Sequence, residues 1–259
     1  MAVKNKYCTT CARAINLKIP MPEHTCFKNY VGPSSGMEAE AILDGFQQSM
    51  SMYGLIYSTL IADGDSSTYA RIRNSHPYPN IIVQKIECSN YLIRNYSNQI
   101  EKITKDTGFP LEFRKIISTN KLRLRKAVVG AANYRMQSNS ALDQKIINLR
   151  KDLLNGPKHV FGEHKDCLPY FCKFKLDPNK ILDYNHVPQL QSNIIFSKIM
   201  DANSRLVSNA RSLVYCLDSN IVESFNGVIA KFIGGKRINY SLTHWPQTPT
   251  ACRVCDSGT

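Results

Sequence analysis

The chain has 259 residues, enough for one large domain or two small ones. Hydrophobic residues make up 43% and charged residues 20%, which is ordinary for a folded protein and excludes a disordered one. Lysine and arginine outnumber aspartate and glutamate by 33 to 20, and the net charge of +13 favours a polyanionic partner, nucleic acid before membrane.

The nine cysteines favour metal binding over disulfide bonds. The sequence begins MAVKNKYCTT, which lacks the apolar region of a secretory signal. No apolar run reaches the roughly 18 residues that would span a bilayer, so we expect no membrane partner. Without export, clustered cysteines beside histidines are typical of metal ligation in a reducing compartment.

Residues 1–35 are turn-rich, show no helical period and carry four potential metal ligands. Cys8 and Cys11 are separated by two residues, and His24 and Cys26 by one. Thiolates and an imidazole in a set of four are what structural zinc prefers. We therefore expect a zinc-binding segment, with chance placement of buried free cysteines as the alternative.

Residues 36–99 alternate between helix and strand. Apolar spacing predicts a helix over 37–52, a strand over 57–62, a short helix over 66–73 and a buried strand over 81–86. A strand, helix and strand in succession predict a parallel pair within an α/β layer.

Asp63 follows the first of these strands, at the position where open α/β sheets build their sites. It is a candidate metal-binding carboxylate, with Asp65 as the alternate. The competing interpretation is a turn followed by a helix cap. A calcium loop is excluded, because Thr68 and Asn74 stand where such a loop needs glycine and glutamate.

Residues 100–190 combine a basic helical stretch with a second Cys/His cluster. A merely solvated helix face usually mixes both signs of charge, whereas residues 111–135 hold one acidic residue, Glu112, so we expect phosphate contacts along DNA. The seven basic residues are Arg114, Lys115, Lys121, Arg123, Arg125, Lys126 and Arg135. The cluster comprises His164, Cys167 and Cys172, with His159 nearby, and indicates a second zinc site whose fourth ligand is open.

The helical period returns over residues 191–241, which we expect to form the C-terminal helices. Glu223 opens the last helix, beside an apolar stripe that includes Ile221 and Phe225. Asn220 precedes it by three residues, as in a capping box, so the glutamate is either a cap or a functional carboxylate. Residues 242–259 show no periodicity and predict an irregular tail.

Taken together, these motifs resemble the insect-type Mutator-like transposase domain. The stretch ADGDSSTYARIRNSHPYPNIIVQKIECSNYLIRNY matches the middle of that domain, and the flanking NKYCTTCARA, HTCFKNY, SGMEAEAILDGF, HKDCLPYFC and SNIVESFNGVIAKFIGGKRIN follow in the family's order. The matching positions in the middle stretch are Asp63, Pro79, Cys88, Tyr91, Arg94 and Asn95. The resemblance covers about residues 3–241.

The resemblance implies an RNase H-like fold with a DDE triad, in which two aspartates and a glutamate bind Mg²⁺ or Mn²⁺ and DNA ends are cut and joined. By position, the second aspartate is Asp63, the glutamate is Glu223, and the basic helical stretch is the family's insertion. The implied partner is DNA at transposon ends, the implied location is the nucleus, and a homo-oligomer is compatible with this scheme.

Three departures qualify the resemblance. The family's first aspartate falls before Met1, so we expect an incomplete RNase H-like α/β core with a long helical insertion and small zinc-binding elements, inactive as a nuclease. Tyr91 replaces the histidine of the family's Cys-x2-His motif, and the sequence after Leu242 does not resemble the family. The alternative function is a non-enzymatic, zinc-dependent DNA-binding protein derived from a transposase.

Overall fold

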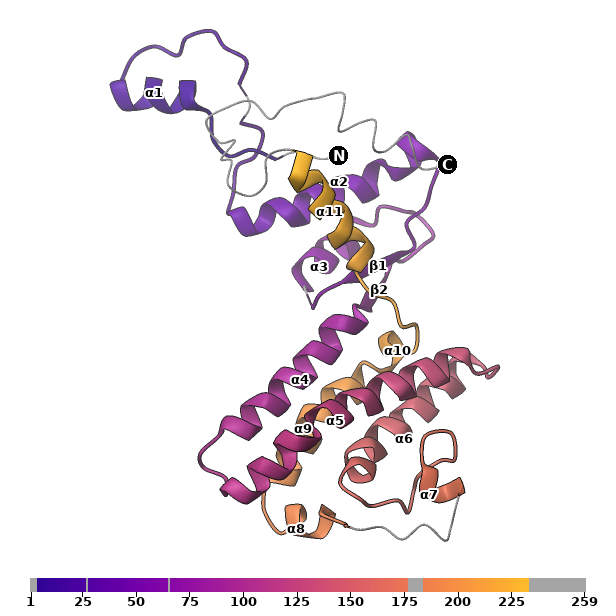
Figure 1. Cartoon of the computed structure of the whole chain (residues 1–259). Coiled ribbons are helices and arrows are strands. Elements are labelled where there is room, and N and C mark those ends of the chain that lie inside the picture. Colours follow the sequence, from indigo (N-terminus) through magenta and orange to yellow (C-terminus); the bar gives the residue numbers. More distant parts are fainter. Residues whose placement is uncertain (1–3, 27, 65, 177–183, 233–259) are drawn as a thin grey trace. The chain divides into compact units, whose positions relative to one another are not determined.

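The chain divides into two compact units in a computed structural model that describes residues 4–26, 28–64, 66–176 and 184–232 (Figure 1). The N-terminal unit comprises Met1–Leu60, Asp65–Lys85 and Asn220–Thr259. The helical unit comprises Ile61–Gly64 and Ile86–Ser219. The expected tail over 242–259 lies outside the described residues.

The described residues of the N-terminal unit form four helices: α1 (Thr9–Leu17), α2 (Ser34–Tyr53), α3 (Ser66–Ser75) and α11 (Asn220–Phe232). The helices predicted over 37–52 and 66–73 are confirmed as α2 and α3. The expectation that residues 1–35 hold no helix is wrong, because α1 forms there. It ends at Lys18, whose left-handed backbone (φ 50°) closes the helix with N–H bonds back to Ala14 and Ile15.

The core of the N-terminal unit is small. It consists of Phe46 from α2, Ile72 from α3, and Tyr78 and Val83 from the segment after α3. The Ser49 and Tyr78 hydroxyls, 2.7 Å apart, add a buried hydrogen bond. The short core leaves other apolar side chains of this unit in solvent; for example, Leu55 is 55% exposed.

A two-stranded parallel sheet joins β1 (Thr59–Ala62) to β2 (Gln84–Glu87). The Gln84 N–H donates to the Ser58 carbonyl and the Cys88 N–H to the Ala62 carbonyl, so both strands run the same way, as predicted. The second strand was expected to be buried and to start at residue 81. It starts three residues later, and Ile82 is 74% exposed.

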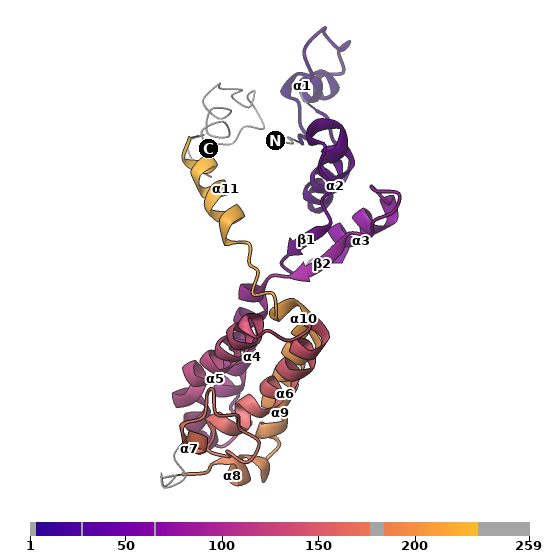
Figure 2. The same ribbon diagram turned by 90° about the vertical axis from the view of Figure 1, so that its right-hand side faces the viewer.

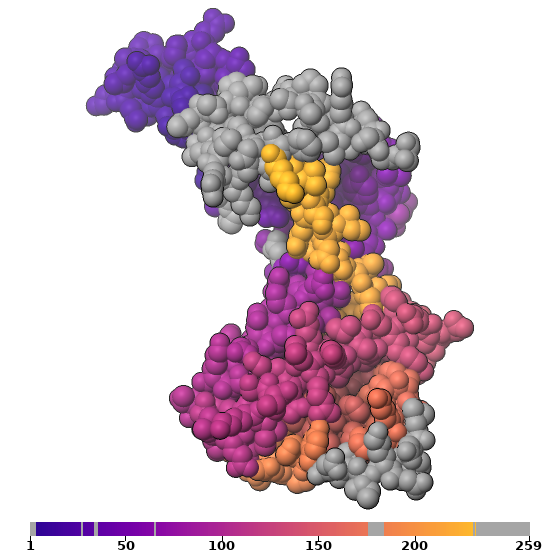
Figure 3. All heavy atoms as spheres, viewed as in Figure 1, coloured from indigo at the N-terminus to yellow at the C-terminus, as the bar shows by residue number. Residues whose placement is uncertain are grey.

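The helical unit contains α4 (Ser89–Lys105), α5 (Leu111–Gln137), α6 (Leu142–Val160), α7 (Lys173–Leu176), α8 (Val187–Gln191), α9 (Ile195–Ser208) and α10 (Ala210–Leu213). Helix α5 packs against α4 and α6, and α9 packs against the same two helices (Figure 2). Atoms of α4, α5 and α6 form one continuous surface in Figure 3. The long helices therefore enclose a common core.

That core is continuous and well filled. Ile117, Leu124, Leu149, Ile199 and Leu206 are each at most 1% exposed. The described residues are thus mostly helical, and the predicted α/β character holds for β1, α3 and β2. None of the described helices combines the length and apolar character needed to cross a membrane.

Candidate functional site

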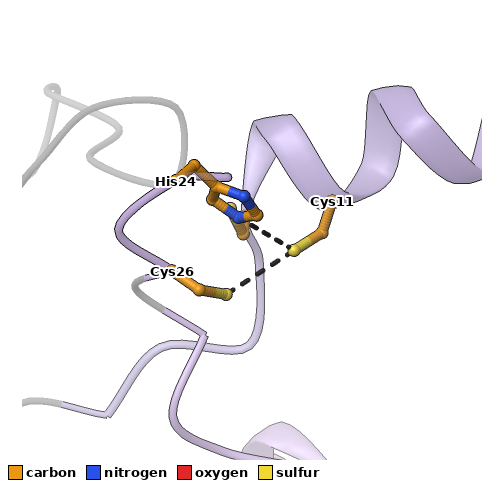
Figure 4. Close-up of side chains that lie close together, drawn as sticks. Cys11, His24 and Cys26 are labelled. Carbon is orange, nitrogen blue, oxygen red and sulfur yellow. Dashed lines mark hydrogen bonds between the residues drawn. The ribbon is translucent and has the colours of Figure 1, made fainter. Parts of the chain in front are cut away.

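Four ligand side chains meet around the start of α1, and we call this group the Cys3His centre. Cys11 Sγ lies 3.3 Å from His24 Nε2 and 3.5 Å from Cys26 Sγ (Figure 4). Cys8 Sγ also lies 3.3 Å from His24 Nε2. All four ligand atoms lie within 4.8 Å of one another. Neighbouring ligands of a tetrahedral zinc ion are roughly 3.5–3.8 Å apart, given bonds of about 2.0–2.3 Å. The predicted ligands are therefore together and could hold a metal ion.

Neighbouring backbone groups favour the metal-binding protonation states of two ligands of the Cys3His centre, His24 and Cys8. His24 Nδ1 lies 2.8 Å from the Pro22 carbonyl, which can only accept a hydrogen bond, so the ring proton sits on Nδ1 and Nε2 keeps its lone pair toward the sulfurs. The Cys11 backbone N–H lowers the pKa of the Cys8 thiol to about 6. A thiolate is therefore accessible at neutral pH, as metal ligation requires.

The second cluster forms a His2Cys2 centre in the helical unit, with His159 as its fourth member. His159 belongs to the last turn of α6, His164 and Cys167 to the following loop, and Cys172 directly precedes α7. His159 Nδ1 lies 3.0 Å from His164 Nδ1 and 3.3 Å from Cys167 Sγ. Cys172 Sγ lies 3.3 Å from His164 Nδ1. The fourth ligand that the sequence left open is thus supplied by a helix five residues upstream of His164.

Burial sets the charge of the His2Cys2 centre. Desolvation, and after it the neighbouring His164, lowers the pKa of His159 to about 4. Burial likewise lowers the pKa of His164. Both imidazoles are therefore neutral near pH 7, the form that binds metals. Burial raises the pKa of Cys167 to about 11, while the Asn155 amide, 3.4 Å from that sulfur, favours its thiolate.

Asp63 lies at the carboxyl end of β1, directly after Ala62, and contacts two residues of the helical unit. Arg94 Nη2 of α4 lies 3.9 Å from Asp63 Oδ2. The Ser219 hydroxyl donates to Asp63 Oδ1 at 3.5 Å. With 41% of its side chain exposed, Asp63 keeps access to solvent. The alternate candidate, Asp65, lies outside the described residues.

The turn after Asp63 is fixed by its neighbours. The Gly64 N–H donates to Glu87 Oε2 at 2.9 Å. Gly64 has φ +64°, and a Cβ added to it would lie 2.5 Å from the Tyr91 hydroxyl oxygen, so only glycine fits. Glu87 is the last residue of β2, a second carboxylate at the strand ends that the sequence reasoning missed. The rule that selected Asp63 would also have selected Glu87.

Cys88 and Tyr91, which match the family's Cys-x2-His positions by resemblance, pack against neighbouring residues. Cys88 is 1% exposed, and its Sγ lies 3.5 Å from the Ser219 hydroxyl. The Tyr91 ring packs over Gly64. Within the described ranges, neither side chain joins a group of potential metal ligands.

Glu223 lies in the first turn of α11 and is exposed. It belongs to the N-terminal unit, whereas Asp63 belongs to the helical unit. The apolar stripe predicted beside it is largely in solvent, with Ile221 83% and Phe225 42% exposed. The interpretations of Glu223 as a cap or as a functional carboxylate both stay predictions.

All seven basic candidates lie on α5, but their environments differ. Lys115, Arg125 and Lys126 are exposed, and no hydrogen bond or ion pair joins their side chains to other described residues. Arg114 donates Nε–H to the Phe109 carbonyl, Lys121 pairs with Glu101, and Arg123 donates to Asn120 and to the Tyr184 hydroxyl.

Arg135 is 9% exposed and faces the interior of the helical unit. Its Nε and Nη2 atoms lie 2.6 and 3.1 Å from the two carboxylate oxygens of Asp152 on α6. The guanidinium carbon also lies 5.2 Å from the Tyr134 ring centroid and 5.4 Å from that of Tyr170. Arg135 is therefore bound to α6 and separated from the exposed basic residues of α5.

Comparisons with known proteins place these sites in a family. The model of the Mutator-like transposase family matches residues 1–172, a stretch that contains Asp63 and both Cys/His centres. No curated protein and no solved structure matches the chain. Because the family model covers well over half of its residues, the chain belongs to the Mutator-like transposases.

Proposed function

We propose that the chain derives from enzymes of DNA transposition, whose reaction is metal-dependent cleavage and joining of DNA ends. The observation that carries this proposal is Asp63, which stands at the carboxyl end of a parallel strand pair in a chain of the Mutator-like transposase family. An exposed carboxylate at such a strand end is suited to bind a divalent cation.

Asp63 and Glu223 are the metal ligands in this proposal. Mg²⁺ or Mn²⁺ at these carboxylates would neutralise charge on the attacking and leaving oxygens at phosphorus. Arg94, 3.9 Å from Asp63, partly compensates the carboxylate charge. Ser219 holds the other carboxylate oxygen. The residues around Asp63 thus position a group that must face DNA.

The two Cys/His centres bind structural zinc in this proposal. Each offers four nitrogen and sulfur ligands, the set that tetrahedral zinc prefers, and neither leaves a ligand position for water. The ligands of the Cys3His centre span residues 8–26, and those of the His2Cys2 centre span residues 159–172. Zinc therefore folds two short segments and takes no part in the chemistry.

The DNA backbone is bound by the exposed basic residues of α5. Lys115, Arg125 and Lys126 are available for phosphate contacts, which supply affinity and salt dependence without reading sequence. The substrate places the protein in the nucleus and makes transposon ends the specific partner. A homo-oligomer, which would bring two ends together, is consistent with the role.

Binding of Mn²⁺ to the zinc-loaded chain tests the assignment of Asp63 and Glu223. If both carboxylates bind one cation, Asp63→Asn and Glu223→Gln each remove the same site in a calorimetric titration, and the double variant loses nothing more. Glu112→Gln, at an exposed carboxylate on α5, is the control and should leave the titration unchanged.

Loss of the site in only one of the two variants would overturn the shared cation. The matching measurement on DNA is Mn²⁺-dependent nicking: nicking that Asp63→Asn abolishes would show that the chain retains the family's reaction. DNA binding that needs zinc and is never accompanied by nicking would instead support the non-enzymatic alternative.

A further inference from the structure

A pocket opens beside Asp63, between α4 and α9 of the helical unit. Its volume is about 310 Å³, within the range of sites that hold small molecules. Gly64, the residue after Asp63, forms part of its wall. The pocket is therefore adjacent to the proposed metal-binding carboxylate. The side chains that line it and matter here are Glu87, Tyr91, Asn95, Gln99 and Arg205.

Three of these side chains have hydrogen-bonding groups available to a ligand. Asn95 and Gln99 lie one turn apart on α4, and Arg205 lies in the last turn of α9. In the part of the chain that the structure describes, none of the three side chains makes a hydrogen bond or ion pair. The two amides each offer donors and an acceptor, and the guanidinium offers five donors.

This lining suits a nucleobase better than a phosphate or an apolar ligand. A phosphate would be repelled by the Glu87 carboxylate, which also lines the pocket. An apolar ligand would leave the amides and the guanidinium without partners. A base offers donors and acceptors on its edge and flat faces that pack on aromatic rings, such as Tyr91.

We propose that this pocket binds an unpaired base of the substrate DNA, next to the phosphate at Asp63. The proposal rests on the proposed function, since it takes the DNA to be held at Asp63. Asn95, Gln99 and Arg205 bind the edge of the base, and Glu87 accepts from an exocyclic amino group. A base that leaves the duplex here would hold the neighbouring phosphate in register with the carboxylate.

Three DNA duplexes that share the same paired sequence and differ only at one 3′ end test the pocket with the full zinc-loaded chain. One is blunt, one carries a single unpaired nucleotide at its 3′ end, and one carries an abasic residue in place of that nucleotide. We expect the unpaired base to tighten binding about tenfold over the abasic duplex, as hydrogen bonds to a charged side chain do. Arg205→Ala and Gln99→Ala should remove that difference.

A matched control separates base recognition from loss of charge. Lys198 is exposed on the same helix as Arg205 and does not line the pocket, so Lys198→Ala should keep the tenfold preference. Equal binding of the abasic and base-carrying duplexes would overturn the pocket alone. So would an Arg205→Ala variant that weakens all three duplexes equally, because that result indicates a phosphate contact. Absence of binding to every duplex would overturn the proposed function together with the pocket.

Discussion

The N-terminal unit and the helical unit differ in the size of their apolar cores. The helical unit encloses a continuous apolar core that joins α4, α5, α6 and α9. The N-terminal unit has a core of four buried residues and leaves apolar side chains such as Leu55 and Ile82 in solvent. A small apolar core does not stabilise a fold sufficiently by itself, and a bound metal is one source of additional stability. We therefore expect loss of metal to destabilise the N-terminal unit more than the helical unit.

Removal of metal is expected to have the largest effect, and a different one in each unit. Structural zinc contributes on the order of 10–16 kcal/mol of apparent binding free energy in small zinc-dependent folds. A chelator should therefore expose the amides of α1 to hydrogen exchange while those of α5 stay protected. Equal loss of protection in both helices would contradict the comparison.

The metal content of variants assigns the ions to the two centres. Cys8→Ser and Cys172→Ser should each lower the bound zinc by one ion per chain. Cys216, outside both centres, provides the control, and Cys216→Ser should leave the zinc content unchanged.

Truncation of Arg135 should give the next largest effect. Arg135→Ala leaves the buried Asp152 carboxylate without its bidentate partner, which costs about 3–5 kcal/mol of unfolding free energy. Arg125→Ala, on the exposed surface of the same helix, should change it by no more than about 0.5 kcal/mol. Urea unfolding measures both. Similar values for the two variants would show that the buried pair adds nothing to the helical unit.

The same substitution, isoleucine to alanine, should lower the unfolding free energy by different amounts in the two cores. Ile199 and Ile72 are both fully buried, one in each core. Replacement of isoleucine by alanine costs about 2–5 kcal/mol, less where the surroundings can collapse into the space. We expect Ile199→Ala near the upper value and Ile72→Ala near the lower one. The reverse order, measured by thermal unfolding, would contradict a small, yielding core in the N-terminal unit.

The smallest of these effects concerns the turn at the strand ends. Gly64→Ala forces an alanine into a left-handed backbone against the Tyr91 ring, at a cost of about 1–2 kcal/mol or more. Gly130 of α5 has nothing within 4 Å of an added Cβ, so Gly130→Ala should stabilise the chain by about 0.5–1 kcal/mol. Equal effects of the two substitutions on unfolding would refute the close packing of Tyr91 on Gly64.

The helices could be predicted from sequence because they show a local apolar period, and the parallel order because a strand, a helix and a strand follow one another. The predicted bounds of the second strand, 81–86, were less accurate than those of the helices. Ile81 and Ile82 are apolar and β-branched, which favours a strand, but the hydrogen bonds start only at Gln84. Helix α1 spans only Thr9–Leu17, too short for its apolar period to be recognised, and it ends at the left-handed Lys18.

Some residues of the candidate sites could likewise be recognised from the sequence, and others could not. Ligand spacing identified the Cys3His centre because all its ligands lie near one another in the chain. His159 was seen only as a neighbour, because its position on a helix departs from the loop spacing of zinc ligands. Arg135 was grouped with the other basic residues of α5 by sign of charge. It lies 20 residues after Lys115, a helical rotation of roughly 200°, which turns it to the opposite face.

The contact between Asp63 and Ser219 joins residues 156 positions apart, whereas each zinc centre closes within a short segment. During synthesis, each Cys/His centre could therefore take up a metal ion as soon as its own ligands emerge from the ribosome. The carboxylate of Asp63 gains its contact with Ser219 only after residue 219 has been made, 156 positions later. In a nascent chain, the two Cys/His centres would thus be complete before the surroundings of Asp63 are.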